Sequence, residues 1–164
     1  LHLRIPEGRI VAEKTLNAKV GIEGGISVLG TTGLVEPWDD HLTETVMERV
    51  RTSDKVVLTT GRTGLRYARL LFPDHEAVLA GSHLEAAIAE ARGDVVLCGL
   101  PALILRFLDP DLPGSTGYAT IEEFSTQPEF KDKMSAAFSK GKERYPGLRI
   151  VILDRNGTIM GDSG

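Results

Sequence analysis

The segment GGISVLGTTGLVEP, residues 24–37, decides the fold that the sequence predicts. Apolar and β-branched side chains at residues 26–29 indicate a short buried strand that ends abruptly in a glycine-rich loop. Glycine allows backbone angles and close approaches that a Cβ would prevent, so a ligand can lie against the N–H groups of such a loop. A tight connection without a ligand is the alternative. The candidate binding residues of this loop are Gly30, Thr31, Thr32 and Gly33.

The same plan recurs four times downstream, in KVVLTTGRTG (55–64), EAVLAGSH (76–83), DVVLCGLP (94–101) and RIVILDRNG (149–157). Each is a short apolar run that ends in a turn. Periodic apolar positions follow the first three, which predicts β-loop-α units. We therefore expect an α/β fold with a mostly parallel, open sheet of four or more strands and helices on both faces. The glycine-rich loops then lie at the carboxyl ends of the strands, where such sheets bind ligands.

The 164 residues fit a single domain with a sizeable core. The chain begins at Leu1, without methionine and within a strand-like LHLRI. We therefore expect residues 1–25 to be an irregular lead-in segment, the tail of an N-terminal domain that is absent here. Residues 26–164 form the predicted α/β domain.

The composition and the absent motifs argue against several classes of protein and of binding site. The 19 basic and 23 acidic residues leave a net charge of −4, which argues against a nucleic-acid-binding surface. The single cysteine, Cys98, cannot form an internal disulfide, and its apolar run favours inert packing. The sequence has no apolar run long enough to cross a membrane and no signal-peptide pattern, so we expect a cytoplasmic protein. It also lacks metal-ligand spacing, a nucleotide-phosphate loop and a nucleophile elbow, so neither a bound metal nor a hydrolase is expected.

The loop at residues 61–64 repeats the pattern of glycine and threonine and brings arginines with it. Arg62, Arg66 and Arg69 lie at the loop or on the helix predicted at 65–72, which suggests an anion site. Arg62 is the strongest candidate because it lies on the ligand edge, whereas Arg66 and Arg69 also fit a solvated helix face. Gly61 and Gly64 complete this candidate site.

The third unit turns at Gly81 into a predicted capping box of Ser82 and Glu85, and Gly93 is expected to end the helix. His83 then lies at a helix N-terminus on the ligand edge, where the positive end of the helix favours a neutral imidazole. A solvated histidine is the alternative interpretation.

The remaining helices and turns are predicted from capping residues and turn-forming residues. A helix is expected from residue 38, with Val46 and Val50 on its apolar face. The segment DPDLPGSTG, residues 109–117, is either a lid or a connector. Thr120 is expected to open a second capping box. Pro128 is expected to interrupt the helical stretch that runs to residue 145. Residues 154–157 are predicted to form a hairpin turn into an antiparallel pair of strands at the edge of the sheet.

One long segment, residues 5–37, reads IPEGRIVAEKTLNAKVGIEGGISVLGTTGLVEP. It resembles the hallmark segment of the CbiD family of cobalt-precorrin-5B C1-methyltransferases. The segment VVLTTGRTGLRYARLL, residues 56–71, resembles the next glycine-turn segment of that family. The likeness runs from about residue 6 to 99 and returns, more loosely, at 149–161. The family typically continues with Gly-His-Ile-Gly-Lys, whereas Gly99 is followed here by Leu100 and no histidine follows His83.

The resemblance implies transfer of a methyl group from S-adenosylmethionine to a ring carbon of a cobalt-containing tetrapyrrole. Arg62, Arg66 and Arg106 are then the positions expected to pair with the carboxylates of the tetrapyrrole. Arg106 also keeps a cation where the family often has a lysine. No residue is assigned as acid or base, because the protein mainly has to align two ligands. A non-catalytic corrinoid-binding or assembly protein is the alternative.

Overall fold

The computed structural model describes residues 4–15, 22–26 and 40–164, with no description of the side chains of residues 40–43. The chain divides into two compact units, Leu1–Pro37 and Trp38–Gly164. The strand predicted at residues 26–29 and the loop at 30–33 fall almost wholly on residues 27–39, outside the described ones. They remain predictions, as does a domain boundary after residue 25.

The described part of the first unit contains one short helix, α1 (Gly8–Glu13). Its first turn is held by local bonds, with the N–H of Val11 donating to the carbonyl of Glu7 at 3.0 Å. The irregular structure expected here is therefore wrong over α1. The sequence pattern missed this helix because Ile10 and Val11 are exposed, so no buried face creates an apolar period.

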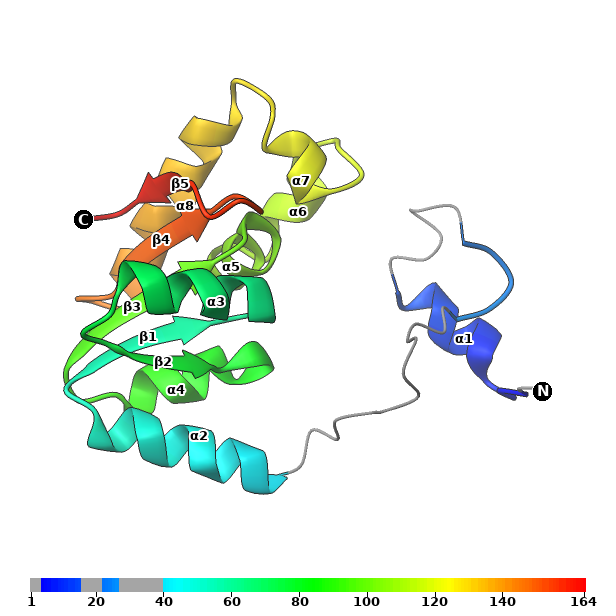
Figure 1. Cartoon of the computed structure of the whole chain (residues 1–164). Coiled ribbons are helices and arrows are strands. Elements are labelled where there is room, and N and C mark those ends of the chain that lie inside the picture. Colours follow the sequence, from blue (N-terminus) through cyan, green and yellow to red (C-terminus); the bar gives the residue numbers. More distant parts are fainter. Residues whose placement is uncertain (1–3, 16–21, 27–39) are drawn as a thin grey trace. The chain divides into compact units, whose positions relative to one another are not determined.

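The second unit is built on a five-stranded sheet (Figure 1). Its order is β2-β1-β3-β4-β5, and the first four strands are parallel neighbours while β5 runs antiparallel to β4. This confirms the predicted α/β class and the antiparallel edge pair. The strands are β1 (Lys55–Thr59), β2 (Glu76–Leu79), β3 (Asp94–Gly99), β4 (Arg149–Leu153) and β5 (Ile159–Asp162).

Helices cover both faces of this sheet, as predicted. Strand side chains alternate between two apolar clusters, because successive residues of a strand point to opposite faces. Val57 belongs to the smaller cluster, under α3, whereas Val56 and Leu58 belong to the larger one, which the other helices build. The helical segments are α2 (Asp40–Thr52), α3 (Arg62–Leu71), the 3₁₀ turn η2 (Gly81–His83), α4 (Leu84–Glu90), α5 (Pro101–Leu108), α6 (Leu112–Ser115), α7 (Ile121–Phe124) and α8 (Phe130–Arg144).

Two local predictions in the third unit are wrong. Neither η2 nor α4 has a side-chain cap, so Ser82 and Glu85 form no capping box. The 3₁₀ turn moves the start of α4 to Leu84, and Glu85 pairs instead with Arg144 at 2.6 Å. Gly93 does not end α4, which stops at Glu90.

The C-terminal third follows the predicted pattern. Thr120 caps α7 by accepting from the N–H of Glu123 at 3.1 Å, and α8 begins after Pro128. Residues 109–117 contain the short helix α6, whose Leu112 is buried in the larger cluster. This buried anchor favours the connector over the lid, because a lid has to leave the core when it opens.

Candidate functional site

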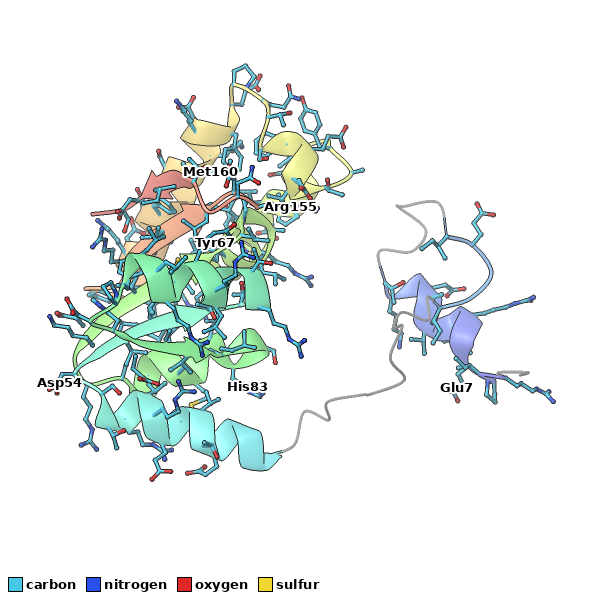
Figure 2. The ribbon with its side chains drawn as sticks, in the orientation of Figure 1. Glu7, Asp54, Tyr67, His83, Arg155 and Met160 are labelled. Carbon is cyan, nitrogen blue, oxygen red and sulfur yellow. The ribbon has the colours of Figure 1, made fainter. Side chains whose placement is uncertain are left out.

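The carboxyl ends of the parallel strands form one edge of the second unit. Figure 2 shows His83 and Arg155 at this edge and Asp54 at the opposite one. From β1 the chain passes to β2 on one side and then to β3 on the other side of β1. The strand order therefore reverses between β1 and β3, and in open α/β sheets such a switch point is where ligands bind.

The backbone is packed closely at the switch point itself. A Cβ on Gly64, in the first turn of α3, would lie 3.1 Å from the Cα of Gly99 at the end of β3. A Cβ on Gly99 would in turn lie 3.2 Å from Oγ1 of Thr60. Both glycines are buried, so their missing side chains make room for other parts of the protein rather than for a ligand.

A hollow of about 490 Å³ opens beside this contact, on the side of α4 and α5. We call it the Arg106 hollow. Its volume lies within the range of about 300–1,000 Å³ that is common for small-molecule sites. Its walls are formed by Thr60, Gly81, Ser82, Leu84, Leu103, Arg106 and Phe107.

Arg106 is the charged residue of this hollow. It is exposed on α5, and no hydrogen bond or ion pair of its guanidinium occurs within the described part of the chain. The neighbouring Phe107 is fixed by stacking on Tyr145, with ring centroids 5.6 Å apart and planes 11° from parallel. The hollow thus combines a cation without an ion-pair partner in the described part of the chain, the hydroxyls of Thr60 and Ser82, and a rigid apolar wall.

A second hollow of about 270 Å³ lies at the ends of β3 and β4. We call it the Asp154 hollow. It shares Leu103 with the first, so the two meet at the first turn of α5. Its walls are formed by Leu100, Pro101, Ala102, Leu103, Glu122, Ser125, Asp154, Arg155 and Met160.

Asp154 is fixed by the turn that follows β4. Its Oδ1 accepts hydrogen bonds from the N–H groups of Thr158 and Asn156, both at 2.8 Å. The hydrogen bonds from Thr158, with a smaller contribution from Asn156, hold the pKa of Asp154 below its ordinary value. The carboxylate is therefore ionised at neutral pH. The adjacent Arg155 forms an ion pair with Glu122 of α7.

The structure distributes the predicted site residues unevenly. Arg106 lines a hollow, as described. Gly61 and Arg62 lie at the start of α3, and His83 is exposed beside Ser82, but none of these three is among the lining residues. Arg66 packs on the ring of Tyr67, with its Cζ 4.6 Å from the centroid, and donates to the hydroxyl at 2.7 Å. The predicted loop at 30–33 lies outside the described residues.

Several lining residues were missed by the sequence patterns. Leu103 and Phe107 lie four residues apart on α5, on either side of Arg106 in the sequence, and both line the Arg106 hollow. Leu103 is 52% exposed. Two apolar side chains at this helical spacing, next to the single cation Arg106, were the sequence signal that could have indicated this wall of the hollow. Asp154 was predicted to lie where the last strand meets its turn but was not named as a site residue, although it directly follows the parallel strand β4 at the ligand edge.

The described residues contain neither a candidate membrane span nor a candidate metal site. No helix among them has the length and apolar character needed to span a membrane. Within the same ranges, no three His, Cys, Asp or Glu side chains gather in a way that could hold a metal ion.

Comparison with known proteins places this architecture in a family. The sequence model of the CbiD family matches residues 1–37. Over 157 residues, 96% of this chain, the sequence is 57% identical to the cobalt-precorrin-5B C(1)-methyltransferase of Methanospirillum hungatei. The chain belongs to the CbiD family. A second CbiD relative, the enzyme of the same name from Methanoregula boonei, is 54% identical over 98% of this chain.

The chain spans about half the length of the curated CbiD relatives that it matches, 47% and 48% of these two proteins. The fold has a solved counterpart in the crystal structure of the cobalamin biosynthesis protein (cbiD) from Archaeoglobus fulgidus. That structure matches 90% of this chain with a TM-score of 0.54 and 34% sequence identity, and this chain covers 43% of it.

Proposed function

We propose that the protein is an S-adenosylmethionine-dependent methyltransferase that methylates C1 of cobalt-precorrin-5B in anaerobic cobalamin biosynthesis. The observation that carries this proposal is the 57% identity to a relative of that name over 96% of the chain. The aligned region covers nearly the whole chain, so it includes the α/β unit as well as the N-terminal segment. We place the reaction in the cytoplasm, where its substrate would be made.

This methyl transfer requires the protein to align the methyl donor with the tetrapyrrole carbon more than it requires an acid or a base. The tetrapyrrole carbon supplies the electron pair for the new C–C bond, the S–CH₃ bond breaks, and the sulfur keeps its electron pair as a neutral thioether. Holding two reactants in line can lower the barrier by about 7–11 kcal/mol. Two hollows that share Leu103 suit this task, because each would hold its ligand against the same side chain.

Arg106 is the residue that we propose for the tetrapyrrole carboxylates, since it lines the larger of the two hollows and its guanidinium has no hydrogen-bond or ion-pair partner among the described residues. Arginine pairs with carboxylates through two parallel hydrogen bonds, which gives orientation as well as affinity. We also keep as proposed ligand contacts the loop at 30–33 and four residues near the starts of α3 and α4, namely Gly61, Arg62, Arg66 and His83.

Label transfer with the intact protein tests the proposal. S-adenosylmethionine carrying a ¹³C-methyl group is incubated with cobalt-precorrin-5B, and the tetrapyrrole is followed by mass spectrometry. We expect one labelled methyl group per tetrapyrrole and one S-adenosylhomocysteine released with it. Binding of the tetrapyrrole without binding or turnover of the methyl donor would contradict the proposal and favour a corrinoid-binding protein.

A further inference from the structure

The two hollows differ in charge. The lining of the Arg106 hollow contains one cation and no carboxylate among the residues that the structure describes. The Asp154 hollow contains two carboxylates, Asp154 and Glu122, and one guanidinium, that of Arg155. Its described lining therefore carries one more negative than positive charge.

The two ligands of the proposed reaction also differ in charge, and each has the sign opposite to that of one hollow. A tetrapyrrole with several peripheral carboxylates is anionic. S-adenosylmethionine carries a sulfonium and an ammonium group against one carboxylate, so it is cationic. Charge complementarity fixes which ligand is accepted by which surface, because like charges placed together cost several kcal/mol.

We propose that the hollows divide the two ligands by charge, with the tetrapyrrole in the Arg106 hollow and the methyl donor in the Asp154 hollow. Leu103 is then a positioning residue at the boundary between them. This assignment rests on the proposed function and adds to it the place of each ligand.

The polar groups of the Asp154 hollow match those of the methyl donor. Arg155 and Glu122 form an ion pair between side chains that are 74% and 58% exposed, and such surface pairs are held weakly. They can therefore separate, so that Arg155 receives the carboxylate of the amino-acid group and Glu122 its ammonium. Asp154 remains a fixed negative charge for the sulfonium. Pro101, Leu103 and Met160 provide the apolar wall that the adenine ring requires.

The Arg106 hollow suits one edge of a large macrocycle. It is the more voluminous of the two, and the exposed apolar surface of Leu103 and the fixed ring of Phe107 flank the guanidinium. A flat apolar ring can lie on these side chains while one of its edge carboxylates reaches Arg106.

Isothermal titration of the intact protein with four probes tests the assignment. Cobyrinic acid, a stable corrinoid with free carboxylates, is compared with its uncharged heptamethyl ester, and S-adenosylmethionine with its thioether product S-adenosylhomocysteine. Arg106→Gln removes the cation, and Asp154→Asn and Glu122→Gln each remove one carboxylate. Glu122→Gln is included because Asp154 also holds a turn, whereas the described contact of the Glu122 side chain is with Arg155 alone.

Two matched controls remove a charge far from the ligand edge. Arg92→Gln changes an exposed arginine between α4 and β3, and Asp74→Asn an exposed aspartate between α3 and β2. Neither side chain forms a hydrogen bond or an ion pair within the described residues. Both controls are expected to bind all four probes like the wild type.

We expect Arg106→Gln to weaken cobyrinic acid binding about tenfold or more, the effect of losing a hydrogen bond to a charged group. Its affinities for the heptamethyl ester and S-adenosylmethionine should stay within about twofold. Asp154→Asn and Glu122→Gln should weaken S-adenosylmethionine binding by about threefold to tenfold and S-adenosylhomocysteine binding less, with cobyrinic acid unaffected.

The reverse pattern, in which Arg106→Gln weakens the methyl donor or the carboxylate variants weaken cobyrinic acid, would overturn the assignment. So would unchanged S-adenosylmethionine affinity in both Asp154→Asn and Glu122→Gln. If the wild type binds both ligands and transfers the methyl group, these results reject the assignment alone and leave the proposed function in place. A wild type that never binds the methyl donor rejects both.

Discussion

Gly64 of α3 and Gly99 of β3 touch backbone to backbone, since a Cβ on Gly64 would lie 3.1 Å from the Cα of Gly99 and 3.3 Å from the carbonyl oxygen of Cys98. This contact sets the distance between the helix and the strand at the switch point of the sheet. The loops that border the Arg106 hollow leave β1 and β3 at this place, so their positions depend on it.

Gly64→Ala should destabilise the protein by about 1–3 kcal/mol, because a methyl group has to be inserted between two packed backbones. Urea unfolding followed by circular dichroism measures the change. Gly61→Ser, three residues earlier in the same motif, is the control. A Cβ at Gly61 meets nothing within 4 Å, and serine is favoured at the N-cap position that Gly61 occupies, so its stability should equal or exceed that of the wild type. Equal losses in both variants would contradict the packing role of Gly64.

The ion pair between Arg149 and Asp162 should make stability depend on pH in the acid range. Nε and Nη2 of Arg149 donate to the two carboxylate oxygens of Asp162 at 3.0 and 2.7 Å. These hydrogen bonds hold the pKa of Asp162 below its ordinary value. A group with a lowered pKa in the fold contributes stability above its unfolded pKa of about 3.9, and this contribution is lost as the pH falls through the folded pKa.

Asp162→Asn should therefore lower the free energy of unfolding by about 0.5–1 kcal/mol at pH 7, a magnitude usual for a well-aligned surface pair. The difference from the wild type should shrink as the pH falls below about 4. Urea titrations at several pH values check this, with Asp74→Asn as the variant that should follow the wild type throughout. A difference that stays constant down to pH 2.5 would show that the carboxylate charge is not its source.

Cys98 should be unreactive in the folded protein. The side chain is fully buried in β3, and burial raises the pKa of its thiol to about 12. The thiolate is the reactive form, so at pH 8 a disulfide reagent such as DTNB should label Cys98 only as fast as the protein unfolds. Adding urea should accelerate labelling in parallel with unfolding. Rapid labelling under native conditions would contradict this burial.

Leu103→Ala should affect turnover more than binding. The side chain is half exposed, and alanine is a good helix former, so the fold should be retained. If Leu103 positions the two ligands against each other, kcat should fall about tenfold to a hundredfold, while KM for each substrate stays within about threefold. Leu70→Ala, at an exposed leucine of α3, is the control and should leave kcat unchanged. A rise in KM with constant kcat would show that Leu103 only binds substrate.

The strands of the sheet could be predicted from the sequence because their signals are local. The run Val56, Val57 and Leu58 is buried on both faces of β1, and a continuous apolar run followed by a glycine turn is typical of such a strand. The hairpin at residues 154–157 was equally local. Gly157 has φ +86° there, a conformation that favours glycine.

Other features depend on contacts between distant residues and leave no local pattern. Gly93 was expected to end a helix, but a Cβ there would lie only 1.9 Å from the carbonyl oxygen of Asp54, which accepts from the N–H of Asp94 at 2.9 Å. The candidate site likewise depends on contacts between residues that are distant in the sequence. Gly81 and Leu103 meet in one hollow because β2 and β3 lie on opposite sides of β1, and no pattern in the sequence states that order.

The most direct test of the central claim, methyl transfer at the carboxyl edge of this sheet, is the kcat/KM of Arg106→Gln for the tetrapyrrole at saturating S-adenosylmethionine. We expect it to fall about tenfold to a hundredfold, as the loss of a charged hydrogen bond implies, while KM for S-adenosylmethionine is unchanged and Arg92→Gln behaves like the wild type. A wild-type kcat/KM in Arg106→Gln would contradict the claim and place the reaction elsewhere in the protein.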